Sequence, residues 1–200
     1  LWMDLTGRTP RSYSETRWWP KWEVYHQLMV QFGDVARFGE EAKDAKVCLQ
    51  LLPQLQAILS GPQRPTNLKL ELAATIDVGE HFVKATYFLE GDGPLVFTCY
   101  ERLSAVSQFC QAPCFPNVRA IATAIAEEDP CQNVTALERS AKACAEPAMT
   151  WFLIKFKVDL YDVVVAFKAA RLFCPVRIQR LKLSALVKSL RAFLFLDSDT

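Results

Sequence analysis

The stretch LKLELAATIDVGEHFVKATYFLEGDGPLVFTCYERLSAVSQFC, residues 68–110, decides the fold of this chain. In its first half, apolar residues recur at helical spacing along one face: Leu68, Leu72, Ile76, Val83 and Tyr87. They predict a helix over about 68–90, which the motif GDG ends. A second helix is predicted from Pro94 to about residue 110. Two antiparallel helices joined by so short a turn form a helical hairpin.

The segment before this hairpin is also predicted to be mainly helical. Residues 1–15 are expected to form an extended or loop-like lead-in, with any strand confined to the first residues. A helix should begin near Pro20 and end at Gly33, because apolar residues follow at spacings of three and four: Trp22, Tyr25, Met29 and Phe32. Another helical region is expected over 35–60, kinked or restarted at Pro53.

The segment after the hairpin continues the helical pattern. A short helix is expected over 118–128, and a longer pattern starts near Thr135 and is expected to break at Pro147. An apolar stripe then predicts a further helix: Phe152, Phe156, Leu160, Val163 and Phe167. Short helices should follow Pro175 and Ser184. Seven glycines in 200 residues also favour helices over a turn-rich sheet, so the fold class is predicted to be all-α.

Composition excludes several classes of protein. Apolar residues make up 51% of the chain and charged residues 22%, which supports a folded core and excludes intrinsic disorder. The most apolar stretch, residues 149–174, is interrupted by charged side chains, and no signal peptide is recognisable, so no membrane association is expected. Seven cysteines, an odd number, indicate a reducing compartment, nuclear or cytoplasmic. The abrupt start at Leu1 suggests a piece of a longer polypeptide.

The residues that most enzymes use for catalysis form no convincing group. The two histidines, His26 and His81, lie on predicted helices away from any nucleophile motif, and no Gly-rich phosphate loop follows a strand. Asp77 and Glu80 share a helix face poorly, and residues 127–129 form a solvated acidic run. We therefore predict neither catalytic residues nor a metal site in this chain.

Basic charge is concentrated near the C-terminus. Between Val163 and Leu196 there is no acidic residue, and the basic residues are Lys168, Arg171, Arg177, Arg180, Lys182, Lys188 and Arg191. Such a face can neutralise the phosphates of a nucleic acid. The alternative is a solvated face balanced by acidic residues from elsewhere in the fold, and the sequence leaves both interpretations open.

A second unusual feature is the cluster RWWPKW at residues 17–22. Three tryptophans mixed with two cations can stack on bases or fill a core. Trp22 is expected to be a core residue, whereas the roles of Trp18 and Trp19 stay open.

At this cluster the sequence resembles a known family. The segment SYSETRWWPKWEV, residues 12–24, resembles the stretch around the Arg-Trp motif of hAT-superfamily DNA transposases and the host proteins derived from them. The segments FVKATYFLEGDGPLVFTCYERL and AFKAARLFCPVRIQRL, residues 82–103 and 166–181, resemble later parts of the family pattern in the same order. Their order and spacing, rather than any single motif, carry the resemblance.

The resemblance implies a place in a larger protein. In this family, an RNase H-like catalytic domain is interrupted by a large all-helical insertion domain. Residues 1–18 would form the edge of the catalytic domain and residues 19–200 the insertion. The first two catalytic acids would lie before Leu1 and the third after Thr200, so the Mg²⁺ or Mn²⁺ that the full-length family uses would bind outside this chain, which alone should be inactive.

The resemblance also implies a function in cut-and-paste DNA transposition. Arg17 and Trp18 match the Arg-Trp motif, whose Trp would stack on a base displaced from the duplex at the hairpin end. The expected DNA-binding residues are therefore Arg17, Trp18, Lys168, Arg171, Arg177, Arg180 and Lys182. Homo-oligomers would form through regions outside this chain. The alternative is a domesticated or free-standing helical protein-interaction module without DNA chemistry.

Overall fold

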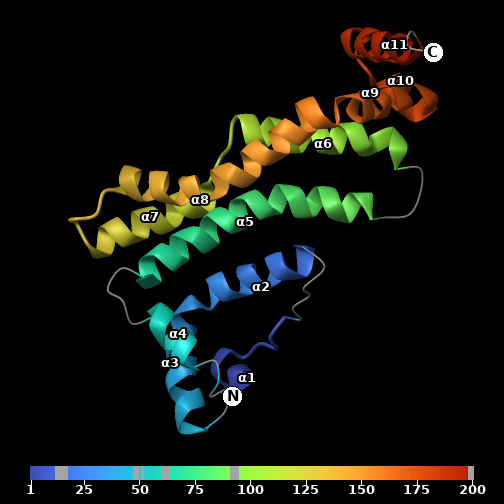
Figure 1. Ribbon diagram of the computed structural model, residues 1–200. Helices are drawn as coiled ribbons and strands as arrows, with labels where there is room; N and C mark the ends of the chain where they lie inside the picture. Colours follow the sequence, from blue (N-terminus) through green and yellow to red (C-terminus); the bar gives the residue numbers. More distant parts are fainter. Residues whose placement is uncertain (12–17, 47–49, 51, 60–63, 91–94, 198–200) are drawn as a thin grey trace. The chain divides into compact units, whose positions relative to one another are not determined.

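The computed structural model describes residues 1–11, 18–46, 50, 52–59, 64–90 and 95–197 of the chain. In these residues every regular element is a helix and none is a strand, so the predicted all-α fold is confirmed. The helices divide into two compact units (Figure 1). The first unit comprises residues 1–83 and 115–146, and the second comprises residues 84–114 and 147–200.

The first unit contains the N-terminal helices and the first parts of two long ones. Its elements are α1 (Trp2–Thr6), α2 (Trp18–Val30), α3 (Phe32–Asp44), α4 (Leu52–Leu59), most of α5 (Arg64–Leu89), α7 (Pro116–Glu128) and α8 (Val134–Ile154) as far as Glu146. The buried side of α5 supplies much of its core, with Leu70, Ala73, Ile76 and Val83 each at most 5% exposed. Of the residues from which the helix was predicted, Leu72, Ile76 and Val83 are buried, whereas Tyr87 is 50% exposed.

A close contact between α2 and α5 depends on a glycine. The indole of Trp22 lies directly against Gly79, and a Cβ at that position would have no room. The indole Nε1 donates a hydrogen bond of 3.2 Å to the carbonyl oxygen of Ile76. Trp22 is thus half-buried in the first unit and its polar atom is satisfied, as a buried tryptophan requires.

The second unit packs around α9. Its elements are the last turns of α5, α6 (Val96–Gln111), the end of α8, a π-helical turn η1 (Lys155–Asp159), α9 (Tyr161–Ala170), a 3₁₀ turn η2 (Arg171–Phe173), α10 (Pro175–Arg180) and α11 (Leu183–Asp197). Helix α9 packs against both α6 and α11, with Val165 and Ala169 buried (Figure 1). Within this unit, the guanidinium of Arg102 on α6 lies 4.1 Å from the ring centroid of Phe88 on α5.

The two helices expected from residues 68–110 are present as α5 and α6, with bounds close to those predicted. Two local expectations near the N-terminus were wrong or displaced. Residues 2–6 form a helix that ends at Gly7 in the left-handed conformation (φ 65°), rather than an extended lead-in. Helix α2 ends at Val30, and Gly33 lies inside α3 because a new helix begins at Phe32.

Two expectations for residues 135–167 were also wrong. Pro147 does not break the helix but lies inside α8, which continues to Ile154. In the turn that follows, the N–H of Leu160 donates to the carbonyl of Lys155, five residues back. This π-helical turn contains one residue more than an α-helical turn and shifts the helix face, so Leu160 and Val163 are 49% and 47% exposed instead of buried. In the described residues, no helix has the length and apolarity needed to cross a membrane.

Candidate nucleic-acid interface

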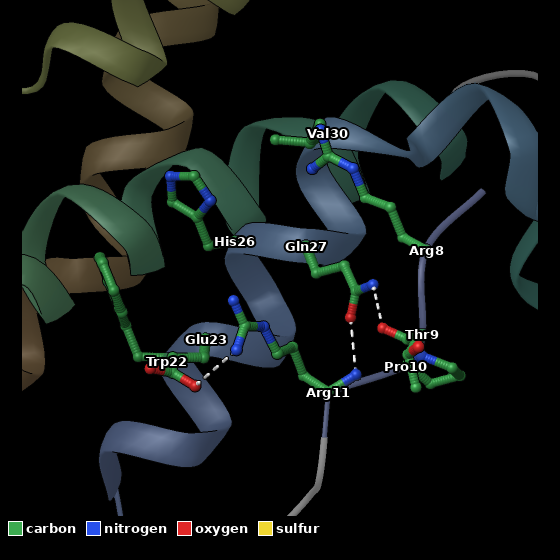
Figure 2. A pocket seen from close by; sticks show the side chains of 9 residues that line it. All are labelled: Arg8, Thr9, Pro10, Arg11, Trp22, Glu23, His26, Gln27 and Val30. Carbon is green, nitrogen blue, oxygen red and sulfur yellow. Dashed lines mark hydrogen bonds and ion pairs between the residues drawn. The ribbon is translucent and has the colours of Figure 1, made fainter. Parts of the chain in front are cut away.

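A pocket of about 810 Å³ lies between residues 8–11 and helix α2 (Figure 2). The side chain of Gln27 holds the extended residues against the helix. Its Oε1 accepts a hydrogen bond of 2.8 Å from the N–H of Arg11, and its Nε2 donates one of 3.0 Å to the carbonyl of Thr9. Both bonds use backbone groups of residues 8–11, so the pocket wall is fixed by main-chain contacts.

The lining of this pocket is rich in basic and aromatic side chains. Arg8, Arg11, Trp22 and His26 face it, with Glu23 as its one acidic lining residue (Figure 2). Arg11 Nη1 lies 3.9 Å from a carboxylate oxygen of Glu23, an exposed pair that contributes little to stability. No ion pair involves Arg8 among the residues that the structure describes. The pocket thus offers one unneutralised cation beside an aromatic side chain.

The Arg-Trp motif lies at the edge of what the structure describes. Arg17 is outside the described residues. Trp18 is the first residue of α2, one helical turn before Trp22, and its side chain is not described. Trp22, expected to be a core residue, packs on α5 and also lines the pocket.

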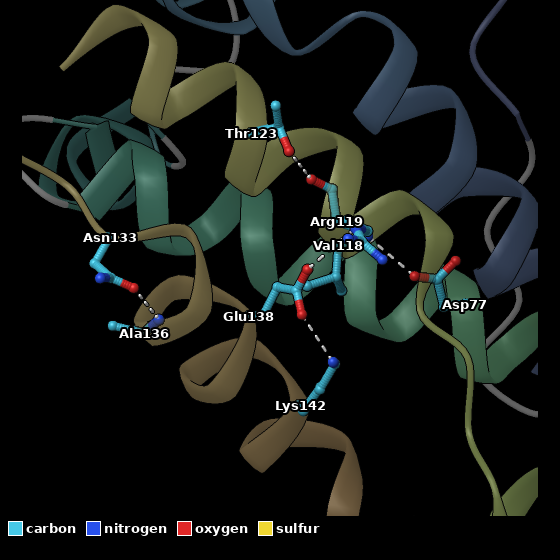
Figure 3. A network of polar contacts seen from close by, with 8 residues as sticks. All are labelled: Asp77, Val118, Arg119, Thr123, Asn133, Ala136, Glu138 and Lys142. Atoms are coloured by element: carbon cyan, nitrogen blue, oxygen red, sulfur yellow. Dashed lines mark hydrogen bonds and ion pairs between the residues drawn. The ribbon is translucent and has the colours of Figure 1, made fainter. Parts of the chain in front are cut away.

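Asp77, which the sequence offered as a carboxylate on a helix, caps another helix instead (Figure 3). Its carboxylate is 2% exposed and accepts hydrogen bonds from the N–H groups of Asn117 (3.2 Å) and Val118 (3.1 Å), and one of 2.5 Å from the Asn117 amide. Both N–H groups belong to the first turn of α7, which has no intrahelical partner for them. Burial raises the pKa of Asp77, and these hydrogen bonds oppose the shift only in part.

Two other acidic side chains of the first unit, Glu138 and Asp129, also have structural partners. Glu138 on α8 lies 3.8 Å from Arg119 on α7 and 3.0 Å from Lys142, so it bridges two helices (Figure 3). Asp129 accepts hydrogen bonds from the N–H of Cys131 and the amide of Gln132. Among the described residues, no three His, Cys, Asp or Glu side chains lie close enough together to hold a metal ion.

In the second unit, Arg171 is held inside the protein. It is 6% exposed, and its Nη2 donates a hydrogen bond of 2.5 Å to the Oγ of Ser189 on α11. Its Nε donates to the carbonyl of Lys168 at 3.2 Å, and its Cζ lies 4.6 Å from the ring centroid of Tyr100 on α6. Arg171 therefore joins α6, α9 and α11, and these contacts give it a structural role beside any contact with DNA.

The remaining predicted basic residues lie at different depths. Lys168 is half-buried, with its Nζ 5.9 Å from the same Tyr100 ring. Lys182, Lys188 and Arg191 are exposed. Arg177 and Arg180 belong to α10, and their side chains are not described. The structure thus places these residues in one unit, on different elements and at different depths.

Charge is distributed unequally between the two units. The second unit has eleven Lys and Arg residues against seven Asp and Glu, whereas the first has twelve against fifteen. The net charge of +1 for the whole chain conceals this separation. The unequal distribution of charge can be found from the sequence only once the boundaries of the two units are known.

The sequence analysis missed an exposed apolar surface on the second unit. Trp151, Ile154 and Val158 are 61%, 49% and 67% exposed, and their spacing of three and four residues places them along one side of the helix. Sequence periodicity alone cannot distinguish such a face from one that packs inside the protein. Apolar surface of this kind is typical of interaction sites.

The geometry therefore presents a basic and aromatic pocket in the first unit and a concentration of basic residues in the second. Comparison of the chain with models of protein families, with curated proteins and with solved structures finds no match.

Proposed function

We propose that this chain is the helical insertion domain of a hAT-type transposase-like protein and that it binds DNA through phosphate contacts. The observation that carries the proposal is the separation of charge. Residues 163–196 include seven basic residues and no acidic one, and they form the consecutive elements α9, η2, α10 and α11 of a unit with net positive charge. A surface of this kind gains affinity for DNA by releasing counterions, one for each phosphate that it neutralises.

The all-helical fold supports the same proposal. An insertion domain of this family is expected to contain helices only, and the described residues contain no strand. In the proposed division of roles, the basic residues of α10 and α11 contact the duplex backbone without regard to sequence. Arg17 and Trp18 recognise the distorted DNA end, where a displaced base can stack on an indole.

Strand cleavage is assigned to carboxylates outside this chain. The carboxylates in the described residues do not fit a two-metal site, which needs several acidic side chains converging on one point. Asp77 is buried at the start of α7, and Asp129 is bound within its own turn. The Mg²⁺ or Mn²⁺ of the parent protein would therefore be held elsewhere, and this chain would position DNA.

The test is a binding titration of a fluorescently labelled 20-base-pair duplex by anisotropy at several salt concentrations. We expect affinity to fall steeply as salt rises, with a logarithmic slope of several units, since each phosphate contact contributes about 0.9. A duplex that fails to bind at low salt would overturn the proposal. The helical protein-interaction module, which the exposed apolar face around Trp151 favours, would then replace it.

A further inference from the structure

Two cationic side chains, Lys168 and Arg171, meet where α6, α9 and α11 pack together, and a third, the exposed Lys188, lies near them on α11. Arg171 and Lys168 both lie against the ring of Tyr100, with Cζ and Nζ at 4.6 Å and 5.9 Å from its centroid. Lys188 precedes Ser189, whose hydroxyl accepts the hydrogen bond from Arg171, and it is close enough to act electrostatically on Lys168. We call Lys168, Arg171 and Lys188 the cation cluster.

No carboxylate neutralises the cation cluster within the described residues. None of the ion pairs found there includes any of its three members, and the elements that supply them contain no acidic residue between Val163 and Leu196. Within the described part of the chain, Lys168 and Arg171 contact the Tyr100 ring, one hydroxyl and one carbonyl rather than a carboxylate.

This arrangement is unfavourable unless something else neutralises it. Arginine is almost never fully buried without a charged partner, and Arg171 is only 6% exposed. Burial, Arg171 and Lys188 together lower the pKa of Lys168, which shows that the protonated lysine is destabilised where it lies. A bound anion would remove the repulsion and restore the pKa.

We propose that the cation cluster is a binding site for a phosphate group. Two lysine ammonium groups and a guanidinium offer many N–H donors, which matches the tetrahedral phosphate with its several acceptor oxygens. Hydrogen bonds to Ser189 and to the Lys168 carbonyl use two of the five N–H groups of Arg171 and fix its orientation. Lys188, which is exposed, and Lys168, which is half-buried, supply the accessible side of the site.

The identification of the phosphate as a phosphodiester of DNA rests on the proposed function. The phosphate site does not depend on that function, because free phosphate has the same chemistry. Inorganic phosphate is therefore the first probe, and the DNA duplex is the second.

The experiment measures the melting temperature of the chain in phosphate and in sodium chloride of equal ionic strength. Phosphate at ten times its dissociation constant should raise the melting temperature by roughly 3–6 °C relative to chloride. Lys168→Gln and Lys188→Gln should each reduce this phosphate-dependent rise. In chloride, the same variants should melt at or above the wild-type temperature, because each removes one repelling charge.

The matched control is Lys157→Gln, an exposed lysine of the same unit outside the cluster, which should keep the full phosphate effect. A wild-type protein whose melting temperature is equal in phosphate and chloride would overturn the proposal, as would an undiminished phosphate effect in both cluster variants. A phosphate effect without binding of the DNA duplex would support the site and remove DNA as its ligand. Salt-dependent DNA binding without any phosphate effect would leave the proposed function standing and refute the cation cluster.

Discussion

Replacement of Asp77 by alanine should destabilise the first unit strongly. The change removes the acceptor of three hydrogen bonds at the start of α7. Val118 is 0% exposed, so its N–H would be left without a partner and would cost about 1–3 kcal/mol. Asn117 is exposed, so its donor groups can bind water once Asp77 is removed. Loss of its hydrogen bonds to Asp77 therefore adds only the contribution of a helix cap, about 1 kcal/mol. We expect a total loss of about 3 kcal/mol.

The assay is urea unfolding followed by circular dichroism. Asp77→Ala should lower the midpoint at an unchanged slope, and Glu128→Gln should serve as the control. Glu128 is an exposed acidic residue at the other end of α7, and its replacement should change stability by less than about 0.5 kcal/mol. A loss below about 1 kcal/mol for Asp77→Ala would refute the reasoning, because it would mean that water or a rearranged α7 satisfies the Val118 N–H.

Titration of the same carboxylate should make the stability of the folded protein depend on pH, in a direction that follows from the shift of its pKa. Burial raises the pKa of Asp77 above its ordinary value of 3.8, so the folded protein retains this proton to a higher pH than the unfolded chain. The contribution of this titration to stability is complete below pH 3.8 and is lost as the pH rises through the folded-state pKa. The stability of the wild type relative to Asp77→Asn, which does not titrate, should therefore fall as the pH rises from 3.5 to 7. A relative stability that increases over this range would contradict the assigned direction.

Three further predictions concern DNA. Replacement of Arg177, Arg180 and Lys182 together by glutamine should weaken binding to any duplex and flatten the salt dependence by up to three units of slope, as measured by anisotropy. Trp18→Ala should leave duplex binding nearly unchanged but weaken binding to hairpin or unpaired ends by about 1–3 kcal/mol; a large fall in melting temperature with unchanged end preference would instead make Trp18 a core residue. With Mg²⁺ or Mn²⁺ the chain alone should neither nick nor join a plasmid, and cleavage that Asp77→Asn abolishes would show a catalytic site that we did not find.

Much of the fold could be predicted because apolar spacing and helix-ending residues act locally. The spacing of Leu72, Ile76 and Val83 predicted α5, and the motif GDG marked its end. The same rules failed at Pro147, since a proline removes one hydrogen bond but packing can still hold the helix together. They failed again at Leu160, because a π-helical turn changes the period on which the prediction depends.

The candidate site was less accessible to prediction because it depends on contacts between distant residues. The sequence identified the basic C-terminal segment, but not that Arg171 turns inward to meet Tyr100 and Ser189. Asp77 was noted only as a carboxylate on a helix, and its role appears when the start of α7 is placed beside it, 40 residues later in the chain. Charge and spacing are visible in a sequence, whereas the direction of a side chain is not.

The π-helical turn at Lys155–Asp159 has a consequence for comparing this chain with its relatives. A helix with one residue fewer here would be continuous, and every later residue would rotate by about 100° around its axis. Val165 and Ala169, now buried, would leave the core, so a deletion at this turn should survive only together with changes on α9. A relative with an ordinary helix should therefore align with a one-residue gap inside residues 155–159. If the gap were placed in the nearest loop instead, all of α9 would be misaligned.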